Sequence, residues 1–198
     1  MRLSVQSFER KFDPQDPEIR HKISEFCASL IQQIDTMSDI ASAFATYAQL
    51  PEQNTVVIDL AETIKRTIEV FDSPFIKLSA PEQGITLNFD KNQLNRLITN
   101  LIKNSLQSLK QNQTSNPEIH VSLEEDQKKV TLVVQDNGPG ISQELKSRVF
   151  EPKFTTKTKG MGLGLAMVKT IVVSYGGTIE ITEPQEGGVA FVMKFPKA

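Results

Sequence analysis

The sequence predicts an α+β fold in which an N-terminal helical hairpin, half of a dimeric four-helix bundle, precedes a two-layer α/β sandwich. Residues 1–50 contain no glycine, and their apolar residues recur every three or four positions, as in amphipathic helices. Beyond residue 54, β-branched stretches alternate with helical ones, and a glycine-rich stretch over 137–162 interrupts the alternation. We therefore expect a hairpin domain over 1–52 and a second domain over 53–198.

Composition limits the classes of protein to which the chain can belong. Its 198 residues suffice for a buried core, and 38% hydrophobic residues exclude a disordered chain. A net charge of −2 gives no reason to expect a nucleic-acid or membrane-surface partner. The single cysteine, Cys27, excludes an intramolecular disulfide and a cysteine-rich zinc site. Because no apolar run approaches the roughly 20 residues of a membrane helix and no signal peptide begins the chain, we expect a cytoplasmic location.

The hairpin is predicted from two amphipathic segments and the break between them. The sequence Asp13-Pro14-Gln15-Asp16-Pro17 interrupts the helical pattern, and Asp16 is a suitable N-cap for the second helix. The apolar positions are Leu3, Val5, Phe8 and Phe12 in the first segment and Ile23, Phe26, Leu30, Ile34, Met37, Ala41, Phe44 and Ala48 in the second. These apolar residues would be exposed in an isolated hairpin, so another surface must bury them. We expect a second copy of the hairpin, and the alternative is the protein's own second domain.

The second domain is predicted as helices over one face of a largely antiparallel sheet. Asp59 and Asp90 are expected to cap helices that run to about Phe71 and Leu109. A third helix is expected over Leu163–Tyr175, and the stretch 137–162 is expected to be a loop with one helical turn. The expected strands are Thr55–Ile58, Phe75–Leu78, Ile85–Phe89, Glu118–Glu124, Lys129–Gln135, Thr178–Thr182 and Val189–Phe195, the fourth and fifth being adjacent and antiparallel.

Two glycine clusters bound that loop and indicate a ligand. Asp136-Asn137-Gly138-Pro139-Gly140 follows a strand, and Gly160-Met161-Gly162-Leu163-Gly164-Leu165 precedes a helix. Glycine lets a backbone approach a ligand, and helix N-terminal amides attract phosphate. Basic residues that could follow a polyphosphate lie between the clusters, namely Lys146, Arg148, Lys153, Lys157 and Lys159. Each cluster alone is more typical of an ordinary turn than of a ligand site, and no P-loop motif is present.

Two asparagines add a third element. Asn100 and Asn104 are four residues apart on the helix that Asp90 begins, so they share one of its faces. Alone, two such amides are more typical of a solvated surface than of a site. The core positions of this helix are expected to be Leu97, Ile98, Leu101 and Ile102, which leaves the asparagines at the edge of a packed region.

Together these elements resemble the four nucleotide-binding boxes of the sensor histidine kinases. The N, G1, F and G2 boxes correspond in order to 100–104, 136–140, 150–157 and 160–164. Those kinases share an ATPase superfamily with gyrase, Hsp90 and MutL. Residues 1–50, with their Phe-Asp-Pro-x-Asp-Pro turn, look most like the dimerisation hairpin of the nitrogen-regulation, NtrY-type kinases.

The resemblance implies ATP and Mg²⁺ as ligands. Asp136 would accept a hydrogen bond from the adenine amino group, while Gly138 and Gly140 would let the base lie against the backbone. Asn104 would bind Mg²⁺ through its amide oxygen, and Asn100, Lys103 and Asn104 would form the catalytic set.

Further ATP contacts are implied for the loop between the clusters and for the start of the following helix. The segment 141–159 would be the ATP lid, anchored on the domain by Phe150 and Phe154. The remaining implied contacts are those of Lys153, Phe154, Thr155, Thr156, Lys157, Gly160, Gly162, Leu163 and Gly164.

The implied activity is transfer of the ATP γ-phosphate to a histidine and then to an aspartate of a response regulator. Related hydrolases carry a glutamate where Asn100 stands, and an asparagine cannot act as a general base. Phosphoryl transfer is therefore favoured over hydrolysis. Two alternatives are a protein-serine kinase of the anti-sigma-factor type and a non-catalytic, nucleotide-responsive scaffold.

The phospho-acceptor is expected to be missing from the chain. In the resembled family it lies in a His-Glu-x-x-Asn-Pro box on the first helix, and neither His21 nor His120 matches that box. We expect that the chain begins just after the box and binds ATP with Mg²⁺ without phosphorylating itself. The resemblance further implies a homodimer through the hairpin, a response-regulator partner, and a full-length protein with upstream sensing segments anchored in the inner membrane.

Overall fold

The computed structural model describes Phe8, residues 12–48, 54–152, Phe154, 162–185 and 187–197, with side chains outside 35–48. The chain divides into two compact units, Met1–Pro51 and Glu52–Ala198. No helix in the described ranges is both long enough and apolar enough to cross a membrane.

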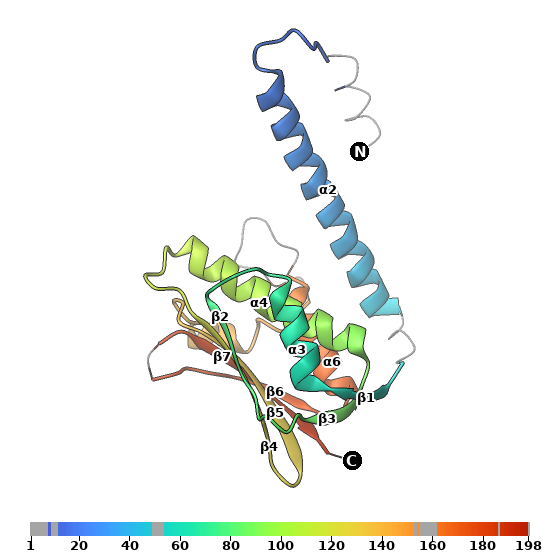
Figure 1. The fold of residues 1–198 in the computed structure, drawn as a ribbon, viewed down its shortest axis with the longest axis vertical. Coiled ribbons are helices and arrows are strands. Elements are labelled where there is room, and N and C mark those ends of the chain that lie inside the picture. The colour runs from blue at the N-terminus through green and yellow to red at the C-terminus, as the bar shows by residue number, and fades with distance from the viewer. Residues whose placement is uncertain are drawn as a thin grey trace. The chain divides into compact units, whose positions relative to one another are not determined.

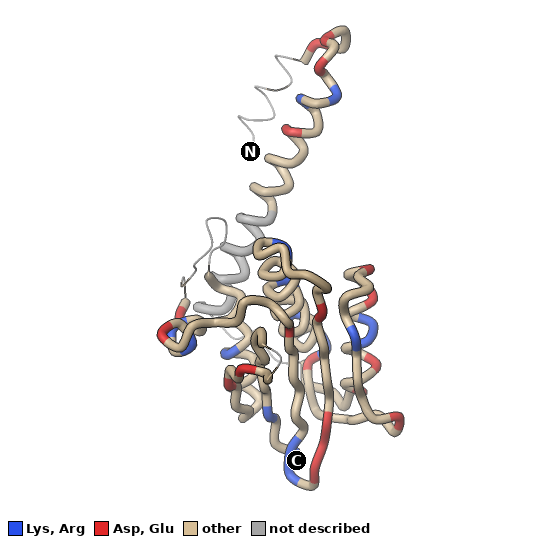
Figure 2. Tube along the Cα trace, turned by 90° about the vertical axis from the view of Figure 1, so that its left-hand side faces the viewer, with Lys and Arg blue, Asp and Glu red and all other residues tan. Residues whose placement is uncertain are grey.

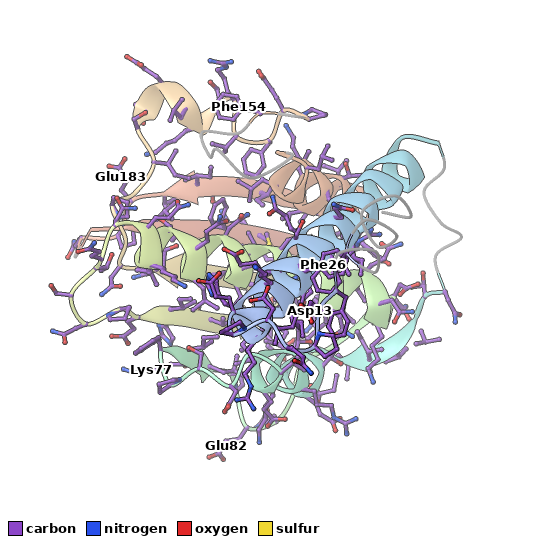
Figure 3. The ribbon with its side chains drawn as sticks, turned by 90° about the horizontal axis from the view of Figure 1, so that it is seen from above. Asp13, Phe26, Lys77, Glu82, Phe154 and Glu183 are labelled. Carbon is purple, nitrogen blue, oxygen red and sulfur yellow. The ribbon has the colours of Figure 1, made fainter. Side chains whose placement is uncertain are left out.

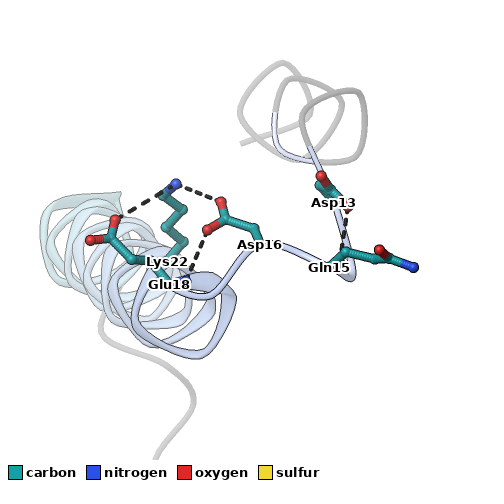
Figure 4. A network of polar contacts seen from close by, with 5 residues as sticks. All are labelled: Asp13, Gln15, Asp16, Glu18 and Lys22. Carbon is teal, nitrogen blue, oxygen red and sulfur yellow. Dashed lines mark hydrogen bonds and ion pairs between the residues drawn. The ribbon is translucent and has the colours of Figure 1, made fainter.

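The first unit is built on one long helix, α2 (Ile19–Ala48), and the acidic turn before it. Asp16 accepts a hydrogen bond from the Glu18 backbone at 2.9 Å and from Lys22 Nζ at 2.6 Å (Figure 4). Asp13 accepts one from the Gln15 backbone at 2.9 Å. The predicted second helix is therefore present, and Asp16 satisfies an amide at its start.

The first helix of the predicted hairpin is described only at Phe8. Its ring stacks on Phe26 of α2 with centroids 4.1 Å apart, and Phe26 is labelled in Figure 3. Leu3 and Val5 lie outside the described residues, as do the side chains of Met37, Ala41, Phe44 and Ala48. Within the described part of α2, the apolar side chains of Ile23, Ile31 and Ile34 are exposed.

The second unit contains a five-stranded sheet in the order β2-β4-β5-β7-β6. The bounds are β2 (Ile76–Ser79), β4 (Ile119–Glu125), β5 (Lys129–Asp136), β6 (Thr178–Thr182) and β7 (Val189–Pro196). Strand β2 runs parallel to β4, and the other pairs are antiparallel, including the predicted β4–β5 pair. A separate ribbon joins β1 (Val56–Asp59) to β3 (Thr86–Phe89). The predicted strands on either side of the Pro81/Gly84 turn thus belong to different sheets.

Three helices lie on one face of this sheet, α3 (Leu60–Glu69), α4 (Lys91–Gln111) and α6 (Gly164–Ser174), as Figure 1 shows. Alternate residues of β4 and β5 point into the core between the two layers, as period-two patterning requires. The buried strand residues include Val121, Leu123, Val130, Leu132 and Val134, which meet Leu97, Ile98, Leu101 and Ile102 of α4. The predicted α+β class and two-layer arrangement are confirmed.

Aspartates begin α3 and α4, as predicted. Asp59 accepts a hydrogen bond from the Glu62 amide at 3.1 Å, and Asp90 accepts from the Asn92 and Gln93 amides at 2.8 and 3.2 Å. The predicted single turn of helix in the long loop is α5 (Gln143–Lys146). Acidic and basic residues lie side by side at the β4–β5 turn (Figure 2), where Lys197 pairs with Glu125 at 2.6 Å.

Candidate functional site

The predicted site residues of α4 lie against the first residue of α6. A β-carbon added to Gly164 would lie 2.9 Å from Asn100 Oδ1 and 3.8 Å from Asn104 Nδ2. Both asparagines are half-buried, whereas Lys103 between them is exposed. Helical spacing puts the two amides on one face of α4, and the helix packing brings the start of α6 to that face.

Asn100 connects the two helices. Its Nδ2 donates to the Arg96 carbonyl at 2.8 Å and lies 3.8 Å from Met167 Sδ on α6. With both amide hydrogens directed at the protein, Oδ1 is the atom that faces Gly164.

Asp136, the last residue of β5, is a buried carboxylate with only 3% of its surface exposed. Its Oδ2 accepts a hydrogen bond from Ser105 Oγ at 2.6 Å, and its Oδ1 accepts one from the Gly138 amide at 3.0 Å. Burial raises the pKa of the Asp136 carboxyl above the usual value for an aspartate, while the two hydrogen bonds oppose that rise. Ser105 directly follows Asn104 on α4. The Asp136 carboxylate therefore lies beside the same stretch of α4 that carries the two asparagine amides.

Glycine is required around Asp136 because there is no room for a side chain. A β-carbon at Gly138 would lie 2.9 Å from Asp136 Oδ1, and one at Gly140 would lie 3.0 Å from the Gly188 carbonyl. Gly140 also has a φ of +78°, which disfavours other residues. At Gly188, a β-carbon would lie 1.8 Å from the Asp136 carbonyl. The backbone around this carboxylate is therefore closely packed and leaves room only for glycine at these positions.

The start of α6 completes the described part of the glycine boxes. Gly162 has a φ of +63°, and Leu163 is the residue immediately before the helix. The predicted contacts Lys153, Thr155, Thr156, Lys157 and Gly160 lie outside the described residues.

The described part of the predicted lid, residues 141–152 and Phe154, is attached to the sheet. Lys146 Nζ lies 2.7 Å from Glu183 Oε1, just after β6, and the Lys146 side chain is only 19% exposed. The Phe150 ring meets Phe191 of β7 edge-on at 6.5 Å. The guanidinium of Arg148 lies over the Phe154 ring at 4.6 Å; Phe154 and Glu183 are labelled in Figure 3.

Two residues of this site were not anticipated from the sequence. Both residues, Ser105 and Gly188, contact Asp136, which is distant from them in the sequence. Nothing in the neighbouring sequence therefore distinguishes Ser105 from any small residue of a helix, or Gly188 from any glycine of a hairpin turn. Asn137, in contrast, lies inside a predicted box, but its side chain binds backbone groups of the protein. Its side chain accepts from the Glu118 amide and donates to the Asn116 carbonyl, both at 2.9 Å.

The residues present fit a nucleotide better than a metal ion alone. Among the described residues, no group of three or more His, Cys, Asp or Glu side chains could hold a metal. A buried acceptor, crowded glycines and two helix-borne amides instead offer one place for a base and another for oxygen-rich groups and a hard cation.

Comparison with known proteins places this site in a family. Residues 89–198 match the histidine kinase-, DNA gyrase B- and HSP90-like ATPases, and the chain belongs to that family. A putative NtrY-like sensor histidine kinase of Rickettsia conorii is 27% identical over 197 residues, which is 98% of this chain and 32% of that protein. The chain therefore spans about a third of that curated relative.

Solved structures agree with the sequence match. The catalytic domain of histidine kinase ThkA is 28% identical with a TM-score of 0.65, covering 73% of this chain and 96% of that one. ThkA in complex with response regulator protein TrrA shares the fold over 98% of this chain and 55% of that one, with a TM-score of 0.72 at 21% identity. The predicted resemblance to sensor histidine kinases is confirmed, and the chain carries their type of ATPase domain.

Proposed function

We propose that the chain is the ATP-binding catalytic region of a two-component sensor histidine kinase. In this proposal it transfers the ATP γ-phosphate to a histidine outside this chain, from which the phosphate passes to an aspartate of a response regulator. The observation that carries the proposal is the placement of Asp136, through Ser105, beside the Asn100–Asn104 face that meets Gly164.

Asp136 is assigned to the base. An ionised carboxylate only accepts hydrogen bonds, so it suits the adenine amino group and repels the oxygen that guanine carries at the same position. Gly138 supports this role because a β-carbon there would lie 2.9 Å from the carboxylate, and we assign Gly138 and Gly140 to the backbone beside the base.

Asn104 is assigned to Mg²⁺ and the start of α6 to the phosphates. Mg²⁺ keeps several water and phosphate oxygens, so one amide oxygen from the protein suffices. When bound, the ion neutralises charge on the phosphates and orients them. Gly164 lies at an α-helix N-terminus, where free amides and the helix dipole favour anions. We assign the further phosphate and lid contacts to Lys153, Phe154, Thr155, Thr156, Lys157, Gly160, Gly162 and Leu163.

Asn100 and Lys103 complete the catalytic set. Asn100 stands beside Asn104 and takes no proton, since an amide is not a general base. Lys103 supplies positive charge from the exposed side of α4. Catalysis then rests on positioning and charge neutralisation, which favours transfer to an external acceptor over hydrolysis.

Neither histidine of the chain is assigned as the acceptor. His21 is exposed and lies 3.4 Å from Glu25 on α2, and His120 lies on the face of β4 that points away from the core. We therefore infer that the chain does not phosphorylate itself.

The hairpin domain (1–52) is assigned to homodimerisation, and the catalytic domain (53–198) to ATP. Exposed Ile23, Ile31 and Ile34 support the dimer, because a second apolar stripe would bury them. The complex of ThkA with TrrA supports a response-regulator partner. We assign this chain to the cytoplasmic side of a longer protein anchored in the inner membrane, with no membrane or nucleic-acid contact of its own.

The test of the nucleotide site is calorimetry with a non-hydrolysable ATP analogue, with and without Mg²⁺. We expect Mg²⁺-dependent binding that Asp136→Ala weakens at least about tenfold, since a buried hydrogen bond to a charged group is lost. Asn104→Ala should remove the Mg²⁺ dependence. Equal binding by Asp136→Ala and the unchanged chain would contradict the assignment.

The test of the activity uses labelled ATP with and without a fragment that carries the histidine box, followed by a response regulator. Acid-labile label on the fragment and then on the regulator is the expected result. Label on a serine would favour the anti-sigma-type alternative, and no transfer at all would favour the scaffold. Acid-labile label on this chain alone would contradict the absence of an acceptor.

A further inference from the structure

We propose that Ser105 is a positioning residue that makes the site select 6-amino purines over 6-oxo purines. Its hydroxyl donates to Asp136 Oδ2 and so presents the carboxylate to the base as a fixed acceptor. This inference rests on the proposed function, because it concerns how the same carboxylate recognises the nucleotide.

The geometry restrains the carboxylate at both oxygens. Ser105 Oγ lies 2.6 Å from Oδ2, and the Gly138 amide lies 3.0 Å from Oδ1. Each carboxylate oxygen has a second lone pair, so each can accept one further hydrogen bond. Ser105 is 2% exposed and comes from a buried turn of α4, so its hydroxyl has a rigid support.

The direction of the hydrogen bond decides what the site can accept. The serine hydroxyl has a single hydrogen, and an ionised carboxylate has none, so the serine must donate. Its oxygen then keeps only lone pairs. Two neighbouring groups therefore offer acceptors and no donor, which suits an amino group and disfavours a carbonyl oxygen.

The serine also opposes protonation of Asp136. Burial raises the pKa of this carboxyl, and the hydrogen bonds from Ser105 and Gly138 lower it. The register neighbours of Asp136 are Ile119 on β4 and Val189 on β7, both apolar.

No charged neighbour in the described part of the chain lowers the pKa of Asp136. No charged side chain of the described residues is among the causes of its pKa shift. Glu118, which lies just before β4, is paired with Lys77 at 2.7 Å. A protonated carboxyl could donate to a 6-oxo group, so loss of the serine hydroxyl would relax selectivity.

The experiment compares the unchanged chain with Ser105→Ala across pH 5–8. Calorimetry measures binding of the imido analogue of ATP and of its inosine counterpart, and NMR follows titration of the Asp136 carboxyl without nucleotide. In Ser105→Ala we expect roughly three- to tenfold weaker ATP-analogue binding at pH 7. We also expect the Asp136 titration and the loss of adenine selectivity to move to higher pH. The control is Ser122→Ala, on the outward face of β4, which should leave both curves unchanged.

The outcomes separate the two proposals. If Asp136→Ala abolishes binding but the Ser105→Ala titration and selectivity curves superimpose on those of the unchanged chain, Ser105 only fills space and this inference fails. If Asp136→Ala binds as well as the unchanged chain, the base assignment itself fails. Should Ser105→Ala unfold at low pH, the comparison at pH 7 still tests the inference, because loss of the hydroxyl must weaken binding of the ATP analogue there, and equal binding would overturn it.

Discussion

Asn100 and Gly164 are in such close contact that a β-carbon on the glycine would lie 2.9 Å from the asparagine Oδ1. This contact joins the middle of α4 to the first turn of α6, and it places the two candidate phosphate-binding elements together. Because the colliding atom is the end of a side chain, the asparagine can move away at small cost to folding.

Gly164→Ala should therefore keep the fold and weaken nucleotide binding. We expect a change in the free energy of unfolding within about 1 kcal/mol, because alanine also favours the helix. Binding of an ATP analogue should fall roughly tenfold, since displacement of Asn100 disturbs the phosphate end of the site. Calorimetry and thermal unfolding measure the two effects. In an Asn100→Ala background the same substitution should have little further effect on binding, and Val173→Ala, at an exposed position of α6, serves as the control.

Gly187 and Gly188 form a matched pair in the β6–β7 turn. Their φ values are +88° and +89°, but a β-carbon at Gly187 meets nothing within 4 Å, whereas one at Gly188 would lie 1.8 Å from the Asp136 carbonyl. We expect Gly187→Ala to cost about 1–2 kcal/mol of unfolding free energy from backbone strain. Gly188→Ala should cost more than about 4 kcal/mol, since backbone atoms must separate. Denaturant unfolding of both variants measures the difference, and equal costs would contradict the packing described.

Asp136→Asn should stabilise the protein at neutral pH while it abolishes selective nucleotide binding. The native pKa of this carboxyl is raised by burial, so the folded state holds its proton more tightly than the unfolded state does. The contribution of Asp136 to stability is therefore most favourable at low pH and is lost as the pH rises through the native pKa. Thermal unfolding between pH 4 and 8 should show that the stability of the variant increases relative to that of the unchanged chain as the pH rises. A difference in stability between the two proteins that does not change with pH would contradict a raised pKa of Asp136.

Tyr175→Phe should destabilise the second unit slightly. The Tyr175 hydroxyl accepts a hydrogen bond from the Asp90 amide at 3.0 Å, and the ring stacks on Phe89 with centroids 3.7 Å apart. Loss of the hydroxyl should cost about 1 kcal/mol, whereas Tyr175→Ala should cost about 3 kcal/mol because the stacking is also lost. Denaturant unfolding measures both, and an equal cost for the two variants would rule out the contribution of the ring.

The Lys146–Glu183 ion pair should restrain residues 141–152, the first part of the predicted lid. The lysine is largely buried in this pair, which joins α5 to the end of β6 at 2.7 Å. Lys146→Ala should raise the rate of proteolytic cleavage within residues 141–152 about two- to fivefold, as expected from loss of a pair worth up to about 1 kcal/mol. Lys194→Ala, which removes an ion pair with Glu180 elsewhere on the sheet, is the control. Equal cleavage rates in the two variants would argue against an anchoring role.

The elements of the second unit could be predicted because each depends on neighbours in the sequence. Asp59 and Asp90 bond to amides two or three residues on, and the alternating pattern of β4 and β5 shows which side chains enter the core. The box residues were recognisable because their spacing along the chain is itself part of the pattern. Their roles toward a nucleotide are still proposals.

The pairing of distant elements could not be predicted in this way. A short strand such as β2 has the same pattern whether it joins β3 or, as found, runs parallel to β4. Likewise, Ser105 and Asp136 are 31 residues apart, and nothing local to either one identifies the other as its partner. Local patterns specify which face of a helix or strand is buried, because burial depends on the period of the side chains. Which side chains meet across the core depends on how the layers pack, and here that packing brings the serine of α4 to the carboxylate at the end of β5.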